Sequence, residues 1–282
     1  RGIWGKLMRS PYVAGQFYSG NREGLKEQIE ECFQSDIGPG ELPSRGDTKR
    51  DIIGCVVPHA GYMYSGPVAA HVYNEFAKQA VPETIVIMGF SHRGFGGLAA
   101  LSNEDWETPL GVVKTDKGTV EELSKDCKLI DIDETAHIKE HSLEVQLPFL
   151  QYIYDDFKIV PLSLHYAASD IVDEISECLS KIEKDFLVIA SSDFTHQETQ
   201  ESATKKDKKA ISHILNMEEK RFLQTIYEDK ISVCGYVPIA TCIATAKKLG
   251  AKRAELLKYS TSGDVTGDHH QVVGYAGIVL RR

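Results

Sequence analysis

Residues 52–61 read Ile-Ile-Gly-Cys-Val-Val-Pro-His-Ala-Gly, an apolar run that ends at a proline followed by a histidine. A short, unbroken apolar run is typical of a strand that is buried on both faces. Pro58 has no N–H for a sheet ladder and disfavours helix for the residue before it, so we expect the strand to end there. This stretch predicts an α/β sheet with His59 at the end of a strand. Ser65 is expected to cap the helix that follows.

Further apolar runs of the same kind occur along the chain, at residues 84–88, 158–162, 186–190 and 272–280. Patterns typical of helices precede or separate them, at residues 21–34, 65–78, 117–126, 142–154, 170–182, 202–215, 218–227 and 238–249. Strands that alternate with helices predict a layered α/β fold, with a central, mostly parallel or mixed sheet between helices.

The length of 282 residues allows one or two domains. No break in composition marks a boundary, so we expect a single domain over residues 8–282. Residues 1–7 precede a methionine, Met8, and are expected to be a cloning remnant. No run of 18 apolar residues exists, so the sequence predicts no membrane-spanning helix.

The charge balance is acidic, with 32 basic and 41 acidic residues and a net charge of -9. Such a surface repels phosphate backbones and anionic lipids, so we expect neither nucleic acid nor membrane as a partner. We therefore expect the ligand to be a small molecule or a peptide. The six cysteines are scattered without a CxxC pair, which favours free thiols in a reducing compartment, and we expect a cytoplasmic protein.

Polar side chains that can hold a metal follow three of the predicted strands. His59, His92 and the pair Asp193 and His196 come just after the runs at 52–57, 84–88 and 186–190. Ligands of open α/β sheets gather beyond the carboxyl ends of the strands, so these side chains are expected to meet. Two neutral imidazoles and one anionic group form the open site of non-haem iron enzymes. The candidates for the anionic group are Asp193, Glu140, Glu144 and Cys234.

A set of short motifs, in order along the chain, resembles the Memo family, in its prokaryotic or archaeal form. The motifs are Ala-Gly-Gln-Phe-Tyr at 14–18, Pro-His-Ala-Gly-Tyr at 58–62, Ser-His at 91–92, Glu-His-Ser-Leu-Glu at 140–144, Ser-Asp-Phe-Thr-His at 192–196, Cys-Gly-Tyr-Val-Pro at 234–238, Tyr-Ser-Thr-Ser-Gly-Asp at 259–264 and Val-Gly-Tyr-Ala-Gly at 273–277. That family is similar in fold to the LigB-like class III extradiol dioxygenases, which cleave catechol rings with ferrous iron.

The resemblance implies a metal site and a proton-transfer pair. His59 and His92 take the two imidazole positions, and Cys234 takes the third, where the dioxygenases carry a glutamate. His196 matches the acid/base histidine, and Asp193 orients it or binds substrate. Fe(II) is the implied metal; a thiolate is softer than a carboxylate, so copper and zinc also fit.

The same motifs make His141, Glu144 and Tyr62 the candidate substrate-binding residues. Three functions stay open. The first is a metal-dependent, dioxygenase-like oxidoreductase. The second is a non-enzymatic module that binds metal, peptide or phosphopeptide, because animal members of the family are regarded as cell-motility mediators that engage phosphorylated receptor tails. The third is a metal-assisted hydrolase; the chain has no GxSxG elbow for a serine hydrolase.

Overall fold

β2 (Ile52–Val57) is buried along its whole length and lies at the centre of the sheet, as its sequence predicts. It pairs in parallel with β9 (Phe186–Ser191), which pairs in parallel with β3 (Thr84–Phe90), and β3 pairs in parallel with β8 (Lys158–Leu164). The carboxyl ends of these four strands therefore lie at one edge. On its other side β2 pairs antiparallel with β12 (Val272–Arg281), so the sheet is mixed.

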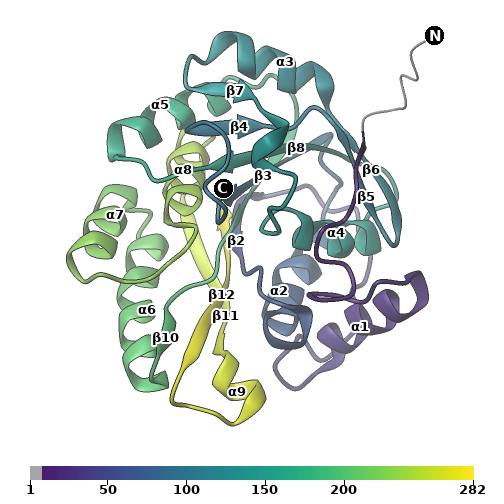
Figure 1. The fold of residues 1–282 in the computed structure, drawn as a ribbon, viewed down its shortest axis with the longest axis vertical. Coiled ribbons are helices and arrows are strands. Elements are labelled where there is room, and N and C mark those ends of the chain that lie inside the picture. Colours follow the sequence, from purple (N-terminus) through teal and green to yellow (C-terminus); the bar gives the residue numbers. More distant parts are fainter. Residues whose placement is uncertain (1–7) are drawn as a thin grey trace.

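The computed structural model describes residues 8–282 (Figure 1). The sheet has the strand order β1-β5-β6-β8-β3-β9-β2-β12-β10, with β11 beside β12, β4 beside β8, and β7 beside β4. The remaining strands are β1 (Met8–Arg9), β4 (Ala99–Leu101), β5 (Asp105–Thr108), β6 (Gly111–Thr115), β7 (Ile130–Ile132), β10 (His196–Glu198) and β11 (Arg253–Thr261). The helices are α1 (Arg22–Gln34), α2 (Tyr62–Ala77), α3 (Lys117–Asp126), α4 (Leu147–Ile153), α5 (Ser169–Ser180), α6 (Gln200–Leu215), α7 (Glu219–Glu228), α8 (Tyr236–Lys248) and α9 (Ser262–Thr266).

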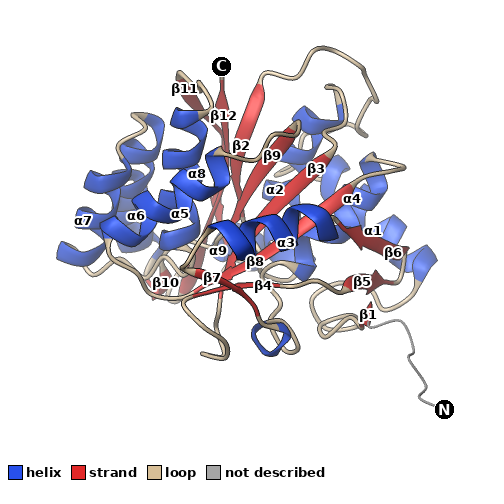
Figure 2. Ribbon diagram, turned by 90° about the horizontal axis from the view of Figure 1, so that it is seen from above, coloured by secondary structure: helices blue, strands red, loops and turns tan. Residues whose placement is uncertain are grey.

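Helices cover both faces of the sheet and bury a separate core on each. Figure 2 shows α5, α6, α7 and α8 on one side of the strands and α1, α2 and α4 on the other. Successive residues of β3 serve the two cores in turn: Ile85 and Ile87 pack with α1, α2 and α4, whereas Val86 and Met88 pack with α5 to α8. The predicted class is thus confirmed, a single α/β domain with a mixed sheet between helices. The expectation for residues 1–7 lies outside the described residues.

Two helices begin at other residues than the sequence predicts. α2 begins at Tyr62 with Gly61 as its N-cap, so the expectation that Ser65 caps it is wrong; Ser65 lies inside the helix and its Oγ donates to the carbonyl of Ala60. The helix expected over 142–154 is a 3₁₀ turn at Glu144–Gln146 followed by the short α4, with Pro148 in its first turn. Among residues 8–282 no helix is long and apolar enough to span a membrane.

The sequence patterns also missed β11, although it forms a long antiparallel pair with β12. Most of its residues are exposed or half-buried, so it carries no continuous apolar run. The short strands β1, β5 and β6 at one end of the sheet were not predicted either, because two to five residues are too few to show a period.

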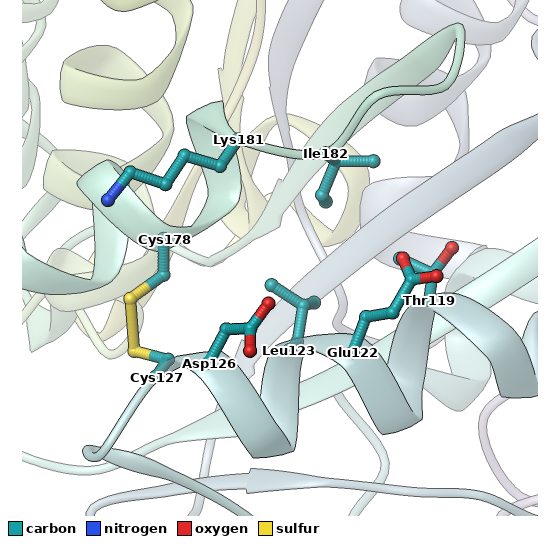
Figure 3. A pocket seen from close by; sticks show the side chains of 8 residues that line it. All are labelled: Thr119, Glu122, Leu123, Asp126, Cys127, Cys178, Lys181 and Ile182. Carbon is teal, nitrogen blue, oxygen red and sulfur yellow. A yellow bond between two sulfur atoms is a disulfide. The ribbon is translucent and has the colours of Figure 1, made fainter.

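The expectation that all cysteines are free is wrong for two of them. Cys127, at the end of α3, and Cys178, near the end of α5, form a disulfide, while Cys32, Cys55, Cys234 and Cys242 are free. Figure 3 shows the bond beside a small pocket between these helices, with the side chains of Asp126 and Lys181 nearby. The bond joins two elements that cover the same face of the sheet.

Breaking this disulfide is expected to lower the free energy of unfolding. It closes a loop with a sequence separation of 51 residues, and restraint of such a loop in the unfolded chain is worth about 2–4 kcal/mol. Urea denaturation of the wild type with and without dithiothreitol, beside Cys178→Ser, measures it. The variant should not respond to the reductant, and an unchanged wild-type midpoint after full reduction would contradict the expectation.

Asp116, the N-cap of α3, lies at the opposite edge of the sheet, where β3 and β8 begin. Its carboxylate accepts hydrogen bonds from Thr84 Oγ1 at 2.6 Å, Lys184 Nζ at 2.9 Å and Thr119 Oγ1 at 3.0 Å. Burial opposes ionisation of this carboxyl, but the three hydrogen-bonded groups outweigh it and lower the pKa from 3.8 to about 2. A carboxyl whose pKa is lowered in the folded state stabilises that state above pH 4.

Asp116→Asn is therefore expected to cost about 1–3 kcal/mol at pH 7, since hydrogen bonds to a charged acceptor are lost. The difference from the wild type should shrink as the pH falls from about 4 to about 2, where the wild-type carboxyl takes up its proton. Urea titrations across that range test the trend, and a difference that stays constant with pH would rule out this origin.

Candidate metal centre

The three side chains predicted to hold a metal meet at the carboxyl edge of the sheet. His59 follows β2, His92 follows β3, and Cys234 lies in the loop before α8. Cys234 Sγ lies 3.3 Å from His59 Nε2, and one ligand atom from each of the three residues lies within 4.8 Å of the others. Ligands at roughly 2.0–2.3 Å from one ion are at most about 4.6 Å apart, so small side-chain adjustments close this set.

The carboxylate of Asp193 holds the loop that carries His59. Its Oδ1 accepts hydrogen bonds from the backbone N–H groups of His59 at 2.8 Å and Ala60 at 3.3 Å. Its Oδ2 lies 4.0 Å from His59 Nε2. The side chain is buried, and burial raises the pKa of Asp193. Asp193 thus fixes the backbone of a candidate ligand and places a carboxyl oxygen beside the centre.

A second buried carboxylate, Glu140, does the same for His92. Glu140 Oε2 accepts the backbone N–H of His92 at 2.7 Å, and Oε1 accepts those of His141 and Ser142 at 2.9 and 2.8 Å. Oε1 also lies 2.9 Å from His92 Nδ1. An ionised carboxylate only accepts hydrogen bonds, so Nδ1 carries a proton and Nε2 is left for the centre. Glu140, one of the four anions considered from the sequence, thus holds His92, and with His92 and His141 it forms a second group whose ligand atoms lie within 4.8 Å of one another.

The two imidazoles differ in how readily they take up a proton. Burial works against a charge on His92, but hydrogen bonds with Cys234 and Glu140 outweigh it and raise the pKa of His92 to about 10. Burial also opposes ionisation of Glu140, and the hydrogen bond and charge of His92 lower the pKa of that carboxyl to about 2. Burial lowers the pKa of His59 well below its usual value, and the neighbouring His92 and His141 add to the effect. His59 is therefore neutral, the form that ligates metals.

His141, predicted to bind substrate, lies against both ligand histidines. Its ring centroid is 4.6 Å from that of His92 and 5.3 Å from that of His59, and Phe17 packs on it at 4.9 Å. Burial lowers the pKa of His141 to about 4, so its ring is neutral at pH 7. The structure brings this residue into the cluster; its substrate-binding role stays a prediction.

His196, the predicted acid/base residue, lies on β10 and is partly exposed. Its Nδ1 is 2.9 Å from the carbonyl oxygen of Ser232, and its backbone N–H donates to Ser232 Oγ at 2.8 Å. A carbonyl only accepts, so Nδ1 carries the proton and Nε2 has a lone pair. The preceding Thr195 is held by the buried Asp207, through its N–H at 3.0 Å and its Oγ1 at 2.6 Å.

Glu144 and Tyr62, the other predicted substrate-binding residues, are buried and hydrogen-bonded to neighbouring chain segments. The Glu144 carboxylate binds Arg9 Nη1 at 2.8 Å, Tyr18 OH at 2.6 Å and the N–H groups of residues 12 and 13. Tyr62 donates its hydroxyl to the carbonyl of Val145 at 2.7 Å. These contacts give both residues a part in holding neighbouring chain segments, and substrate binding by either stays a prediction.

Sequence reasoning missed two residues beside His59. Ser191 Oγ lies 3.0 Å from His59 Nδ1, and Gln146 Nε2 donates to that Oγ at 2.8 Å. Ser191 is the last residue of β9, whose carboxyl end lies at the site, so its position at the end of an apolar run could have identified it. Gln146 follows the Glu-His-Ser-Leu-Glu motif in a 3₁₀ turn, and no sequence pattern singles it out.

The donor set fits a transition-metal ion. Two imidazoles whose Nδ1 atoms are engaged by other groups and one thiol that deprotonates on binding suit iron, copper or zinc. Three protein ligands leave coordination positions open for substrate, as catalytic rather than structural metal sites do. The residues at this edge can therefore hold a metal ion.

Comparison with solved structures shows the fold alone. The chain is similar to an uncharacterized protein, JW3007, from Escherichia coli K12, with a TM-score of 0.53 and 11% sequence identity. The similarity covers 81% of this chain and 99% of that one.

Comparison of sequences shows the family. A MEMO1 family protein of Methanopyrus kandleri is 46% identical over 282 residues, which cover 98% of this chain and all of that protein. A MEMO1 family protein of Methanothermobacter thermautotrophicus is 44% identical, over 96% of this chain and 99% of that protein. The family model described as Memo-like protein matches residues 9–279. The chain therefore belongs to the Memo family.

Proposed function

We propose that the chain is a metal-dependent oxidoreductase whose centre resembles the iron site of class III extradiol dioxygenases, with Fe(II) as its metal. The observation that carries the proposal is the convergence of His59 Nε2, a ligand atom of His92 and Cys234 Sγ within 4.8 Å. Two imidazoles and one anionic ligand with open positions are the donor pattern of non-haem iron oxygenases. The thiolate makes copper the alternative redox metal.

A redox-active ion held there supplies electron exchange with the substrate. The protein's own groups bind and move protons around it. His196 Nε2, whose lone pair is set by the Nδ1 contact with Ser232, accepts a proton from a substrate hydroxyl. Asp193 keeps the His59 loop in place through two N–H contacts. His141, whose neutral ring stacks on that of His92 at 4.6 Å, contacts the substrate beside the centre.

A second candidate is a binding module that keeps the pocket without turnover. The observation in its favour is that several segments following strand ends expose a large apolar side chain. Met63, Phe95, Ile138 and Tyr166 are 63%, 54%, 58% and 70% exposed. Exposed apolar side chains are a feature of peptide-binding surfaces. In this case the ligand is a peptide rather than a small molecule.

We infer from the acidic balance that neither nucleic acid nor membrane is a partner, and from the scattered cysteines without a CxxC pair that the location is cytoplasmic. The Cys127–Cys178 disulfide runs against the usual pattern of a reducing compartment. Intracellular proteins of hyperthermophiles are the established exception. Fractionation of the native host, followed by detection of the protein, tests the location.

Metal binding is the first test of the proposed function. Protein purified without oxygen is expected to hold close to one equivalent of iron, copper or zinc by elemental analysis. His59→Ala and Cys234→Ala should each lose most of it, because two ligands rarely hold an ion against chelators. His165→Ala is the matched control; His165 also follows a strand at this edge, but its Nε2 contacts the carbonyl of Phe95. A wild type without metal, indistinguishable from the two ligand variants, would refute the site.

Turnover separates the enzyme from the binding module. The iron-loaded protein is expected to consume oxygen with at least one member of a panel of catechols. His196→Gln should lower that rate by about 10²–10⁴-fold, with the metal content unchanged, since His196 moves protons without holding the ion. No oxygen uptake by the metal-loaded wild type with any catechol would favour the binding module.

A further inference from the structure

We propose that Ser191 and Gln146 are positioning residues that fix His59 in the tautomer with its proton on Nδ1, which directs the lone pair of Nε2 toward the metal centre. The inference rests on the proposed function for its consequence, metal binding. Its physical content, the tautomer, is a property of the metal-free protein. All three residues are buried, so their hydrogen bonds are not exchanged with water.

The amide of Gln146 has only one orientation that satisfies its neighbours. Its Nε2 lies 3.0 Å from the carbonyl oxygen of Pro58, which only accepts hydrogen bonds. Its Oε1 lies 2.6 Å from the hydroxyl of Tyr73, which donates. If the amide were flipped, Gln146 Oε1 would face the carbonyl oxygen of Pro58, and two hydrogen-bond acceptors would meet. The second N–H of Nε2 is therefore directed at Ser191 Oγ, 2.8 Å away.

The single proton of Ser191 has only one acceptor left to it. Its Oγ already accepts from Gln146, and it lies 2.6 Å from the carbonyl oxygen of Ser142, to which it donates. The remaining neighbour is His59 Nδ1 at 3.0 Å. Since the hydroxyl has no second proton to give, Nδ1 must be the donor in that contact.

A neutral imidazole carries one proton, so Nδ1–H leaves Nε2 as an acceptor. The buried ring of His59, with its proton directed at Ser191 Oγ, therefore presents the lone pair of Nε2. Its Nε2 lies 3.3 Å from Cys234 Sγ, where a thiol proton can be held until a metal replaces it. The other tautomer would set the Nδ1 lone pair against that of Ser191 and place a proton where the ion must sit.

The Nδ1 atoms of both ligand histidines thus donate a hydrogen bond, but to different partners. His92 Nδ1 faces the ionised Glu140, a charged acceptor at 2.9 Å, whereas His59 Nδ1 faces a neutral hydroxyl. A carboxylate partner makes an imidazole a more basic ligand, and a hydroxyl mainly orients it. Loss of Ser191 should therefore act on the orientation and tautomer of His59 and leave His92 as it is.

The tautomer can be measured directly. Long-range ¹H–¹⁵N spectra of the metal-free protein, labelled at the histidine rings, distinguish a protonated Nδ1 from a protonated Nε2, and His59→Asn identifies the signals of His59. We expect the wild-type His59 to be protonated on Nδ1. In Ser191→Ala its signals should move toward the Nε2-protonated pattern. Gln146→Met, which leaves the serine hydroxyl but removes its fixed donor, should give a smaller shift in the same direction.

The effect on metal binding is measured with Zn²⁺ in competition with a chelator. Ser191→Ala is expected to bind Zn²⁺ about 10- to 100-fold more weakly, the usual effect of removing a group that orients a ligand histidine. Ser163→Ala is the matched control. Ser163 lies on β8, separated from β9 by β3, and is equally buried, but its hydroxyl has no hydrogen-bond partner among residues 8–282, so both readouts should match the wild type.

A wild-type His59 protonated on Nε2 overturns the proposal, and so does a folded Ser191→Ala that keeps both the tautomer and the Zn²⁺ affinity. If Ser191→Ala does not fold, the wild-type spectrum and Gln146→Met still decide. A wild type that binds no Zn²⁺, iron or copper refutes the proposed function instead. The spectrum then shows independently whether Ser191 and Gln146 set the tautomer of His59.

Discussion

The buried carboxylate of Glu140 is the group that sets the geometry of this edge of the sheet. It accepts three backbone N–H groups and one imidazole N–H, from the loop after β3 and from its own loop. Burying a carboxylate costs free energy unless its lone pairs are used, and here they are. Asp193 repeats the arrangement at the loop after β2. The histidine backbones are thus placed by carboxylates that do not depend on a metal.

The N-terminal segment is attached to the same region by a third buried carboxylate. Glu144 pairs with Arg9 and accepts the hydroxyl of Tyr18, which places Phe17 against the ring of His141. Removal of one partner of a buried ion pair leaves an uncompensated charge, so this attachment is hard to break locally. The first residues of the domain therefore contact the histidine cluster, whereas the candidate ligands come from residues 59, 92 and 234.

Much of the fold could be predicted because its central strands are continuous apolar runs, and the approximate meeting of His59, His92 and Cys234 followed from strand ends and family motifs. The rest depends on contacts that leave no local pattern. Cys127 and Cys178 are distant in sequence. The helix expected over 142–154 starts instead with turns and a 3₁₀ segment at Glu144–Gln146, which the apolar pattern does not distinguish from an α-helix. β11 is half-exposed, and Gln146 is recognised only through its partners.

The separation of the ligands along the chain has a consequence for biosynthesis. His59 and Cys234 lie 175 residues apart, and the loop that carries Cys234 precedes α8, which packs against β9 and β2 in the core. Contacts of such long range form late, after the intervening chain has been made and folded. A nascent chain therefore emerges from the ribosome with single histidines and no complete site. Any ion that this site holds is therefore bound only after the chain has folded.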